Sequence, residues 1–342
     1  MIMTSAAKAG KHLEQQLEKS GAFFLDTQKM ANSNLDWTPF VDGVPASERA
    51  TYDLRPHQEE AVAKIEETFE TNDRCKAIMA CGTGKTLMSL RLAEEYLDPE
   101  GIGTKTVLFC APSIALVGQS MREWMAQSRV RMSPLVVCSD SRASRLEDSV
   151  PMTLMDFEYP ATTSAESLAS AYAACAASND DGLIVVFSTY QSIDVIHKAQ
   201  QLGIPEFDLV ICDEAHRTTG NALPGVSKAE ASAFMKVHYN ENVAAKKRLY
   251  MTATPRIYGE TAKRKGAEED YTIASMDDES IYGPTAYQIK FGEAVERGLL
   301  TDYKVVVLTV MEDAIGERIA AYDDEGVDAA SLDPEDIGKI IG

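Results

Sequence analysis

The chain has 342 residues, 45% of them hydrophobic and 25% charged, and a formal net charge of −20 at pH 7. This composition predicts a globular protein with room for one large α/β domain and smaller accessory pieces. The acidic balance argues against a basic coat over the whole protein, but it does not exclude a local nucleic-acid surface. No segment approaches the ~20 apolar residues of a membrane span, and residues 1–20 lack the apolar run of a secretory signal. We therefore expect a cytoplasmic protein with no membrane partner.

The six cysteines include no C-x-x-C pair, and several fall in apolar segments that we expect to be buried strands. They are Cys75, Cys81, Cys110, Cys138, Cys175 and Cys212. This usage favours reduced core residues over disulfides or a zinc site. Cys81 is expected to fill a small-residue position.

Residues 1–50 are expected to form a leader, with a short amphipathic helical segment at 12–19 followed by turn residues. A helix is then predicted from Pro56, because proline suits the first helical turn and apolar residues recur on one face at 61, 65 and 69. His57 is expected to be a surface residue of this helix.

The segment 79–86 follows an apolar strand end and precedes a helix predicted over 87–97. Gly82 and Gly84 let backbone N–H groups converge, the helix start favours an anion, and Lys85 adds a positive charge. Thr86 offers a hydroxyl to Mg²⁺. These features predict a nucleoside triphosphate site, although the strict pattern would place glycine where Met79 stands. The alternative is a glycine-rich turn before an ordinary core helix.

Apolar runs alternate with helical patterns along the rest of the chain, and this predicts an α/β fold built on a parallel sheet. Ligands of such sheets bind beyond the carboxyl ends of the strands. Residues 140–181 are expected to form an insertion with a helical tract near 165–177, and residues 113–124 a helix. Further strands are predicted at 106–111, 135–138, 183–187, 209–212 and 248–251.

The strand at 209–212 is followed directly by Asp213, Glu214, Ala215 and His216. Two adjacent acids after a strand can divide the work of a hydrolase, with Asp213 orienting Mg²⁺ and Glu214 acting as the base that polarises water. A strand-to-helix cap is the alternative. The glycine-rich segment about 130 residues earlier favours the catalytic interpretation.

Two segments are rich in cations, 117–145 with five arginines and 241–265 with Lys246, Lys247 and Arg248 among its members. Each is either a solvated face or a surface for DNA phosphates without base readout. Tyr190 and Trp124 could stack on bases, although core packing is favoured for Trp124.

With both sites identified, the chain resembles the superfamily 2 helicases and translocases over about 53–304. This resemblance implies a RecA-like P-loop NTPase fold with ATP and Mg²⁺ as cofactors.

Residues 54–58 resemble the adenine-reading segment, with Arg55 and Gln58. Residues 79–86 resemble motif I, with Gly82, Thr83, Gly84, Lys85 and Thr86. Pro112 and Ser113 resemble motif Ia, and Thr189 and Tyr190 belong to a further strand-backbone contact. Residues 213–216 resemble a DEAH box, and the resemblance implies a catalytic set of Lys85, Asp213, Glu214 and His216. Thr252 and Thr254 resemble motif III. The resemblance implies that His216 contacts one of these threonines and so couples the nucleotide state to the DNA side.

The wording of 213–220 and of 282–303 further resembles the DNA-translocating subunits of type I, type III and single-chain restriction systems and related phage-defence helicases. It implies DNA as a partner, together with restriction or defence subunits.

The resemblance also implies a second RecA-like lobe with an arginine finger, yet only 38 residues follow Lys304 and none of them forms a Gln-x-x-Gly-Arg-x-x-Arg motif. We therefore expect a leader at 1–50, the first lobe at 51–303, and an interlobe connector with the start of a truncated second lobe at 304–342. Such a fragment is expected to bind DNA weakly and to hydrolyse ATP slowly. The alternative function is a non-catalytic nucleotide-sensing or scaffold module.

Overall fold

A computed structural model describes residues 50–97, 104–138, 161–178, 182–220, 233–259 and 274–302, together with four two-residue strands. The short strands form two pairs, β1 (Ile2–Met3) with β2 (Phe24–Leu25) and β3 (Leu35–Asp36) with β4 (Ser47–Glu48). The chain divides into two units, Met1–Leu300 and Thr301–Gly342. The helical segment expected at 12–19 and the connector expected at 304–342 lie outside the described residues.

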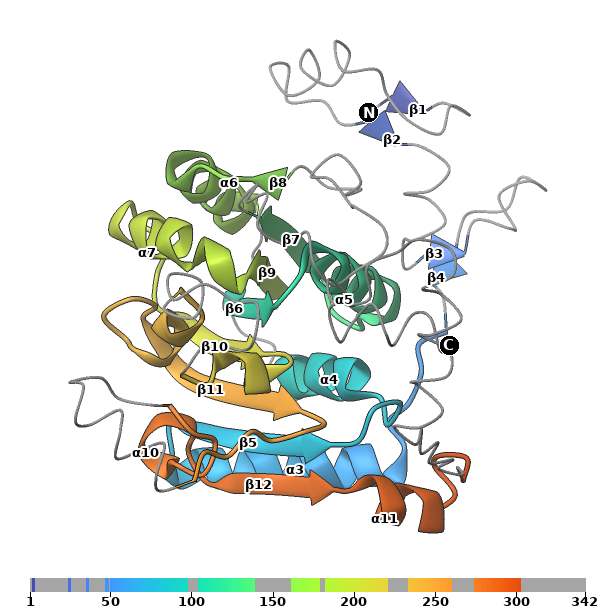
Figure 1. The fold of residues 1–342 in the computed structure, drawn as a ribbon. Coiled ribbons are helices and arrows are strands. Elements are labelled where there is room, and N and C mark those ends of the chain that lie inside the picture. Colours follow the sequence, from blue (N-terminus) through green and yellow to red (C-terminus); the bar gives the residue numbers. More distant parts are fainter. Residues whose placement is uncertain are drawn as a thin grey trace, which may run out of the picture. The chain divides into compact units, whose positions relative to one another are not determined.

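An eight-stranded sheet forms the centre of the first unit (Figure 1). Every neighbouring pair of its strands is parallel, which confirms the predicted parallel α/β sheet. In spatial order the strands are β12 (Thr285–Ile289), β5 (Arg74–Met79), β11 (Ala245–Thr252), β10 (Phe207–Cys212), β6 (Thr104–Ala111), β9 (Gly182–Thr189), β7 (Met132–Val137) and β8 (Ala161–Thr162).

Helices cover both faces of the sheet. One face packs against α3 (Pro56–Thr71), α4 (Lys85–Leu97) and α5 (Ile114–Gln127), and the other against α6 (Ala165–Ser178) and α7 (Ile193–Gln201). Successive strand residues alternate between the two cores, so that Leu209 and Ile211 of β10 face the first set while Val210 and Cys212 face the second. None of the described helices has the length and apolar character needed to cross a bilayer.

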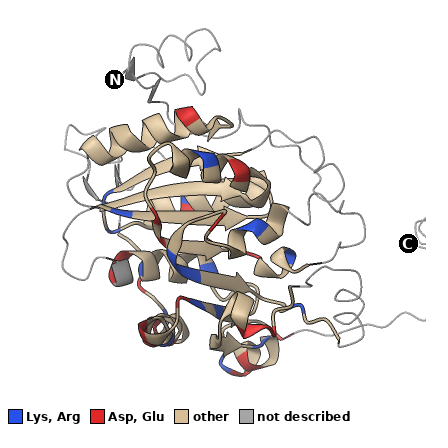
Figure 2. Cartoon of the chain, turned by 90° about the vertical axis from the view of Figure 1, so that its left-hand side faces the viewer, with Lys and Arg blue, Asp and Glu red and all other residues tan. Residues whose placement is uncertain are grey.

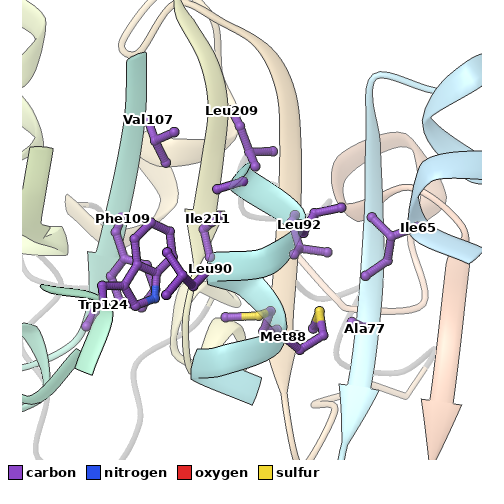
Figure 3. Close-up of a cluster of buried hydrophobic side chains, with 14 of the residues drawn as sticks. Ile65, Ala77, Met88, Leu90, Leu92, Val107, Phe109, Trp124, Leu209 and Ile211 are labelled. Carbon is purple, nitrogen blue, oxygen red and sulfur yellow. The ribbon is translucent and has the colours of Figure 1, made fainter. Parts of the chain in front are cut away.

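The first core holds the helix that begins at Lys85 (Figure 3). Leu90 of α4 lies beside Phe109 of β6 and Trp124 of α5, whereas Leu92 lies on the side of α4 toward Ile65 of α3. Trp124 is fully buried, with its ring centroid 5.5 Å from that of Phe109, so the predicted core role of Trp124 is confirmed. Its indole N–H donates to the Thr86 carbonyl at 3.1 Å and thereby ties the first turn of α4 to α5.

Several elements extend beyond the predicted set. The edge strand β12 (Thr285–Ile289) buries Tyr287 and Ile289 and is followed by α11 (Phe291–Glu296). Short connections contain α10 (Glu279–Tyr282) and the 3-10 turns η3 (Tyr190–Ser192), η4 (Ala215–Thr218) and η5 (Lys236–His238). Strand β8 and helix α6 lie within the expected insertion, and β8 adds a strand to the sheet edge.

Candidate functional site

The loop between β5 and α4, residues 79–86, is called here the glycine loop. Gly82 and Gly84 both have φ of +81°, a conformation that other residues rarely adopt. A Cβ on Gly84 would lie 2.3 Å from Gln58 Nε2, and one on Gly82 would lie 3.1 Å from Leu300 Cδ2. Both positions therefore require glycine. Lys85 begins α4 and donates from Nζ to the Met79 carbonyl at 3.2 Å, across the loop.

Helix α3 braces the glycine loop from behind. Gln58 Nε2 donates to the carbonyls of Thr83 and Gly84 at 3.1 and 3.0 Å, and Gln58 Oε1 accepts from the Arg55 N–H at 2.8 Å. His57 Nε2 lies 2.9 Å from the Thr83 carbonyl. The prediction of a surface His57 is wrong, because the loop covers the first turn of α3 and leaves His57 only 3% exposed.

The predicted contact of Gln58 with the adenine base conflicts with the hydrogen bonds that its side chain makes in this structure. Its side-chain amide makes three hydrogen bonds to backbone groups and is 3% exposed. A primary amide has only two N–H donors, and both are used on the glycine loop. Gln58 could contact a base only after giving up bonds that it makes here, whereas Arg55 is exposed.

Asp213 and Glu214, called here the acid pair, follow β10 at the carboxyl edge of the sheet. Burial, reinforced by repulsion from Glu214, raises the pKa of Asp213 to about 6. The hydrogen bond from His216 lowers the pKa of Glu214, and the positive charge of Lys85 adds to this lowering while it opposes the rise in the pKa of Asp213. The sheet therefore brings the acid pair within electrostatic reach of the glycine loop.

Glu214 is the one described non-glycine residue with a positive φ, at 49°. Left-handed backbone is unfavourable for such a residue and persists where the surroundings impose it, often at functional sites. Here the Glu214 carboxylate lies 3.3 Å from His216 Nδ1, and both side chains are about a quarter exposed, at 27% and 25%. The turn thus presents the carboxylate to solvent at the sheet edge.

His216 links the acid pair to the end of β11, the strand between β5 and β10. Its Nδ1 lies 3.0 Å from Thr252 Oγ1. Thr252 is fully buried and its Oγ1 accepts from the Thr254 N–H at 3.2 Å. The predicted hydrogen bond from His216 to one of these threonines is thus confirmed for Thr252, and Thr254 joins through the Thr252 hydroxyl.

The residues predicted to contact nucleic acid lie together but differ in exposure. Thr189 pairs with Ala111 in the sheet, so Pro112 and Ser113 after β6 adjoin Tyr190 after β9. Pro112 and Ser113 are partly exposed, and the Ser113 hydroxyl caps α5 by accepting from the Leu116 N–H at 3.3 Å.

The prediction that Tyr190 contacts nucleic acid is contradicted by its position. Tyr190 is fully buried and donates its hydroxyl to the Asp213 carbonyl at 2.7 Å, so it cannot stack on a base. Thr189 is 3% exposed and its hydroxyl pairs with that of Ser192, which also argues against a nucleic-acid contact. In this structure Tyr190 instead holds the backbone of the acid pair.

The cations Lys246, Lys247 and Arg248 also differ from the expected DNA surface. They lie at the beginning of β11, whereas Thr252 at its end lies in the site. Arg248 is fully buried and donates from Nε to the Val237 carbonyl at 3.0 Å. Lys246 pairs with Asp208 at 2.7 Å, and Lys247 donates to the carbonyls of Phe69 and Asn72.

Figure 2 shows that Lys and Arg of the described residues are interspersed with Asp and Glu in that view. In the other cation-rich segment, Arg129 pairs with Asp53 at 2.5 Å, and residues 142 and 145 lie outside the described residues.

The core role predicted for the cysteines is confirmed for Cys75, Cys110, Cys138 and Cys212, which are buried. Burial raises the pKa of Cys75, Cys138 and Cys212 to about 12, so these thiols stay protonated at neutral pH. Cys175 is partly buried, and Cys81 in the glycine loop is exposed. No group of three or more metal-ligating His, Cys, Asp or Glu side chains occurs within the described ranges.

Comparison with known proteins relates this site to a family. Residues 51–257, which include the glycine loop, the acid pair and Thr252, match the model of the family described as "Type III restriction enzyme, res subunit". A probable helicase of African swine fever virus is 24% identical over 258 residues, 75% of this chain and 24% of the viral protein.

Two solved structures agree with this match. The ATP-dependent Type ISP restriction-modification enzyme LlaBIII bound to DNA is 37% identical with a TM-score of 0.72, over 99% of this chain and 22% of the enzyme. A nuclease-deletion mutant of the Type ISP enzyme LlaGI, in complex with a DNA substrate mimic, is 41% identical with a TM-score of 0.59, over 73% of this chain and 18% of that protein. The chain thus spans about a quarter or less of the length of these relatives. The predicted RecA-like helicase fold is confirmed, and the chain belongs to the family of Type III restriction enzyme res subunits within the superfamily 2 helicases.

Proposed function

We propose that residues 51–303 form the ATP-binding first lobe of an ATP-dependent DNA helicase or translocase of a restriction or phage-defence system. The observation that carries this proposal is that β5 and β10 lie on either side of β11 and run parallel to it, so the glycine loop and the acid pair follow strands that end at the same edge of the sheet. A lysine in the loop and two carboxylates at the same sheet edge are the groups that a bound phosphate chain and its metal ion need. The structures of LlaBIII bound to DNA and of LlaGI in complex with a DNA substrate mimic support DNA as the partner.

In this proposal the glycine loop is a P-loop. Gly82, Thr83 and Gly84 would surround the phosphates with backbone N–H groups, and the first turn of α4 adds further N–H groups without intrahelical partners. Lys85 would move from the Met79 carbonyl to the terminal phosphates, which offer a more negative partner.

The acid pair would belong to a DEAH box. Asp213 and the Thr86 hydroxyl fit Mg²⁺, because this ion prefers oxygen ligands. A cation would also relieve the repulsion between the buried Asp213 carboxylate and that of Glu214. The ion would neutralise charge that develops on the phosphates. Glu214 suits the role of base, since the hydrogen bond from His216 and the charge of Lys85 keep its carboxylate ionised.

His216, Thr252 and Thr254 would couple the nucleotide state to the DNA-facing side, because their hydrogen bonds lead from Glu214 to the end of β11. Pro112 and Ser113 keep their proposed contact with the DNA backbone. Residues 1–50 would be the leader and 304–342 the connector with the start of the second lobe.

Nucleotide titration of the 342-residue chain tests the proposal. We expect saturable binding of ATP in the presence of Mg²⁺, and loss of most of that binding in Lys85→Ala. Lys64→Ala is the matched control, because Lys64 is an exposed lysine of α3 that pairs with Glu60. Equal ATP binding by the wild type and Lys85→Ala would contradict the P-loop assignment.

A further inference from the structure

His57 is a buried polar side chain that the proposed chemistry does not use. It is 3% exposed, and its Nε2 lies 2.9 Å from the Thr83 carbonyl. Its other nitrogen, Nδ1, is buried and has no hydrogen-bond partner among the described residues. Burying an unpaired polar atom such as Nδ1 is unfavourable, so a histidine at this buried position needs an explanation. The contact of its Nε2 with the glycine loop offers one.

The contact assigns a tautomer to His57. A carbonyl oxygen can only accept a hydrogen bond, so the Nε2 of His57 must carry the proton that it donates to Thr83. Gln58 Nε2 donates to the same oxygen at 3.1 Å. The Thr83 carbonyl therefore has two donors, both from the first turn of α3, and it is directed toward that helix.

The direction of this carbonyl determines the direction of the next N–H group. The described peptide bonds are all trans, and in a trans peptide unit the C=O and the following N–H point in opposite directions. Since the Thr83 carbonyl points to α3, the Gly84 N–H points away from α3. Gly84, on one side of this peptide unit, resists its rotation little, so the hydrogen bonds to the Thr83 carbonyl help to hold it.

We propose that His57 is a positioning residue of the nucleotide site, whose Nε2–H holds the Thr83–Gly84 peptide so that the Gly84 N–H is presented to the phosphate chain. This inference rests on the proposed ATP-binding function. It goes further by assigning the orientation of the Thr83–Gly84 peptide to a residue that contacts no ligand. The effect of His57 should therefore be the same for nucleotides with different bases. His57 and Gln58 would share this work, which also explains why the Gln58 amide is turned toward the loop.

The test compares His57→Phe, which keeps a ring but removes the donor, with His57→Gln, which keeps a terminal N–H donor. Binding of ATP, GTP and inorganic tripolyphosphate to the 342-residue chain is measured by calorimetry, with Lys85→Ala and Lys64→Ala alongside. We expect His57→Phe to weaken all three ligands by the same factor, about five- to tenfold, as suits one hydrogen bond. His57→Gln should recover most of the affinity, and the denaturation midpoints should stay close to that of the wild type.

Different failures have different meanings. If the wild type binds ATP, Lys85→Ala does not, and His57→Phe binds like the wild type, the role of His57 is refuted while the proposed function stands. Weakened ATP binding with unchanged tripolyphosphate binding would refute it in favour of a base contact. If the wild type itself binds no ATP, the proposed function fails and this inference fails with it.

A measurement on the wild type covers the case in which His57→Phe does not fold. The chain has five histidines, so ¹⁵N labelling of histidine gives a small set of signals, and His57→Gln identifies the one from His57. We expect the His57 ring to carry a proton on Nε2. A proton on Nδ1 alone would contradict the hydrogen bond to Thr83 and overturn the proposal.

Discussion

The half of the sheet edge assigned to nucleotide and the half expected to meet DNA use their polar side chains differently. Beyond the ends of β5 and β10, Lys85, Glu214 and His216 are partly exposed, His216 contacts Glu214, and the charge of Lys85 lowers the pKa of Glu214. At the end of β9, Tyr190 is fully buried and bonds to the acid pair from behind. The comparison teaches that one half holds the groups to which we assign chemistry, whereas Tyr190 of the other half holds the backbone of the acid pair in place.

The largest expected effect concerns Glu214. Glu214→Gln keeps the shape of the side chain but cannot accept a proton as a carboxylate does, so any ATP turnover above background should fall by about 10²- to 10⁴-fold. Affinity for Mg·ATP should stay within about twofold, because this charge is not assigned to phosphate or metal. Steady-state hydrolysis and calorimetric binding check the two quantities. Unchanged turnover would require another base.

Acid should destabilise the fold through His238. His238 is buried, within hydrogen-bond distance of the Thr218 carbonyl and the Tyr250 hydroxyl, and burial lowers its pKa from 6.5 to about 4. Between pH 6.5 and 4 the unfolded chain binds a proton that the folded chain does not, so the free energy of unfolding falls as pH falls. The loss should reach on the order of 3 kcal/mol near pH 4.

Urea unfolding of the wild type and His238→Gln from pH 7.5 to 4 isolates this contribution, because other titrating groups are common to both. The stability advantage of the wild type should shrink as pH falls. His197→Gln is the control, because the His197 side chain lies at the surface of α7, where it pairs with Gln201. A difference between wild type and His238→Gln that does not change with pH would contradict the account.

Removing the charge of Lys85 should weaken nucleotide binding by about 10- to 100-fold, which corresponds to roughly 1.5–3 kcal/mol for a charged hydrogen-bonding group. The loss should be larger for ATP than for ADP, because the side chain is assigned to the terminal phosphates. Competition between labelled and unlabelled nucleotides measures both affinities. Equal losses for the two nucleotides would place Lys85 nearer the inner phosphates.

The smallest expected effect distinguishes bracing from DNA contact. Tyr190→Phe removes only the hydroxyl and leaves the Asp213 carbonyl without this partner, which should cost about 1–3 kcal/mol of folding stability. The change in DNA affinity should be no larger than the change in Ser192→Ala, the control that removes a neighbouring buried hydroxyl. A selective loss of DNA binding in Tyr190→Phe, with stability intact, would restore the nucleic-acid role of this residue.

The sequence predicted the parallel sheet and its strands well because those features are local. Apolar runs identify strands buried on both faces, and the glycines beside Lys85 serve a loop whose chemistry depends on neighbours in sequence. The acid pair after an apolar strand is similarly local. The His216 contact with Thr252 was accessible only through the family resemblance, because 36 residues separate the two.

The errors share one cause, since the direction of a side chain depends on distant packing. A tyrosine after a strand suits either a base or a core, and Tyr190 turns inward toward Asp213. His57 was placed at the surface because nothing in 54–58 shows that the glycine loop covers it. Arg248 looked like a DNA contact beside two lysines, yet backbone carbonyls of a separate segment bind it in the core.

The central claim is that the glycine loop and the acid pair act as one site for Mg·ATP. A double-mutant cycle with Lys85→Ala and Asp213→Ala tests it most directly, with Mg·ATP affinity as the measured quantity. Residues that share one network show coupling energies of about 0.5–3 kcal/mol, and independent residues add. We predict a coupling energy in that range, and two losses of affinity that simply add would contradict a single site.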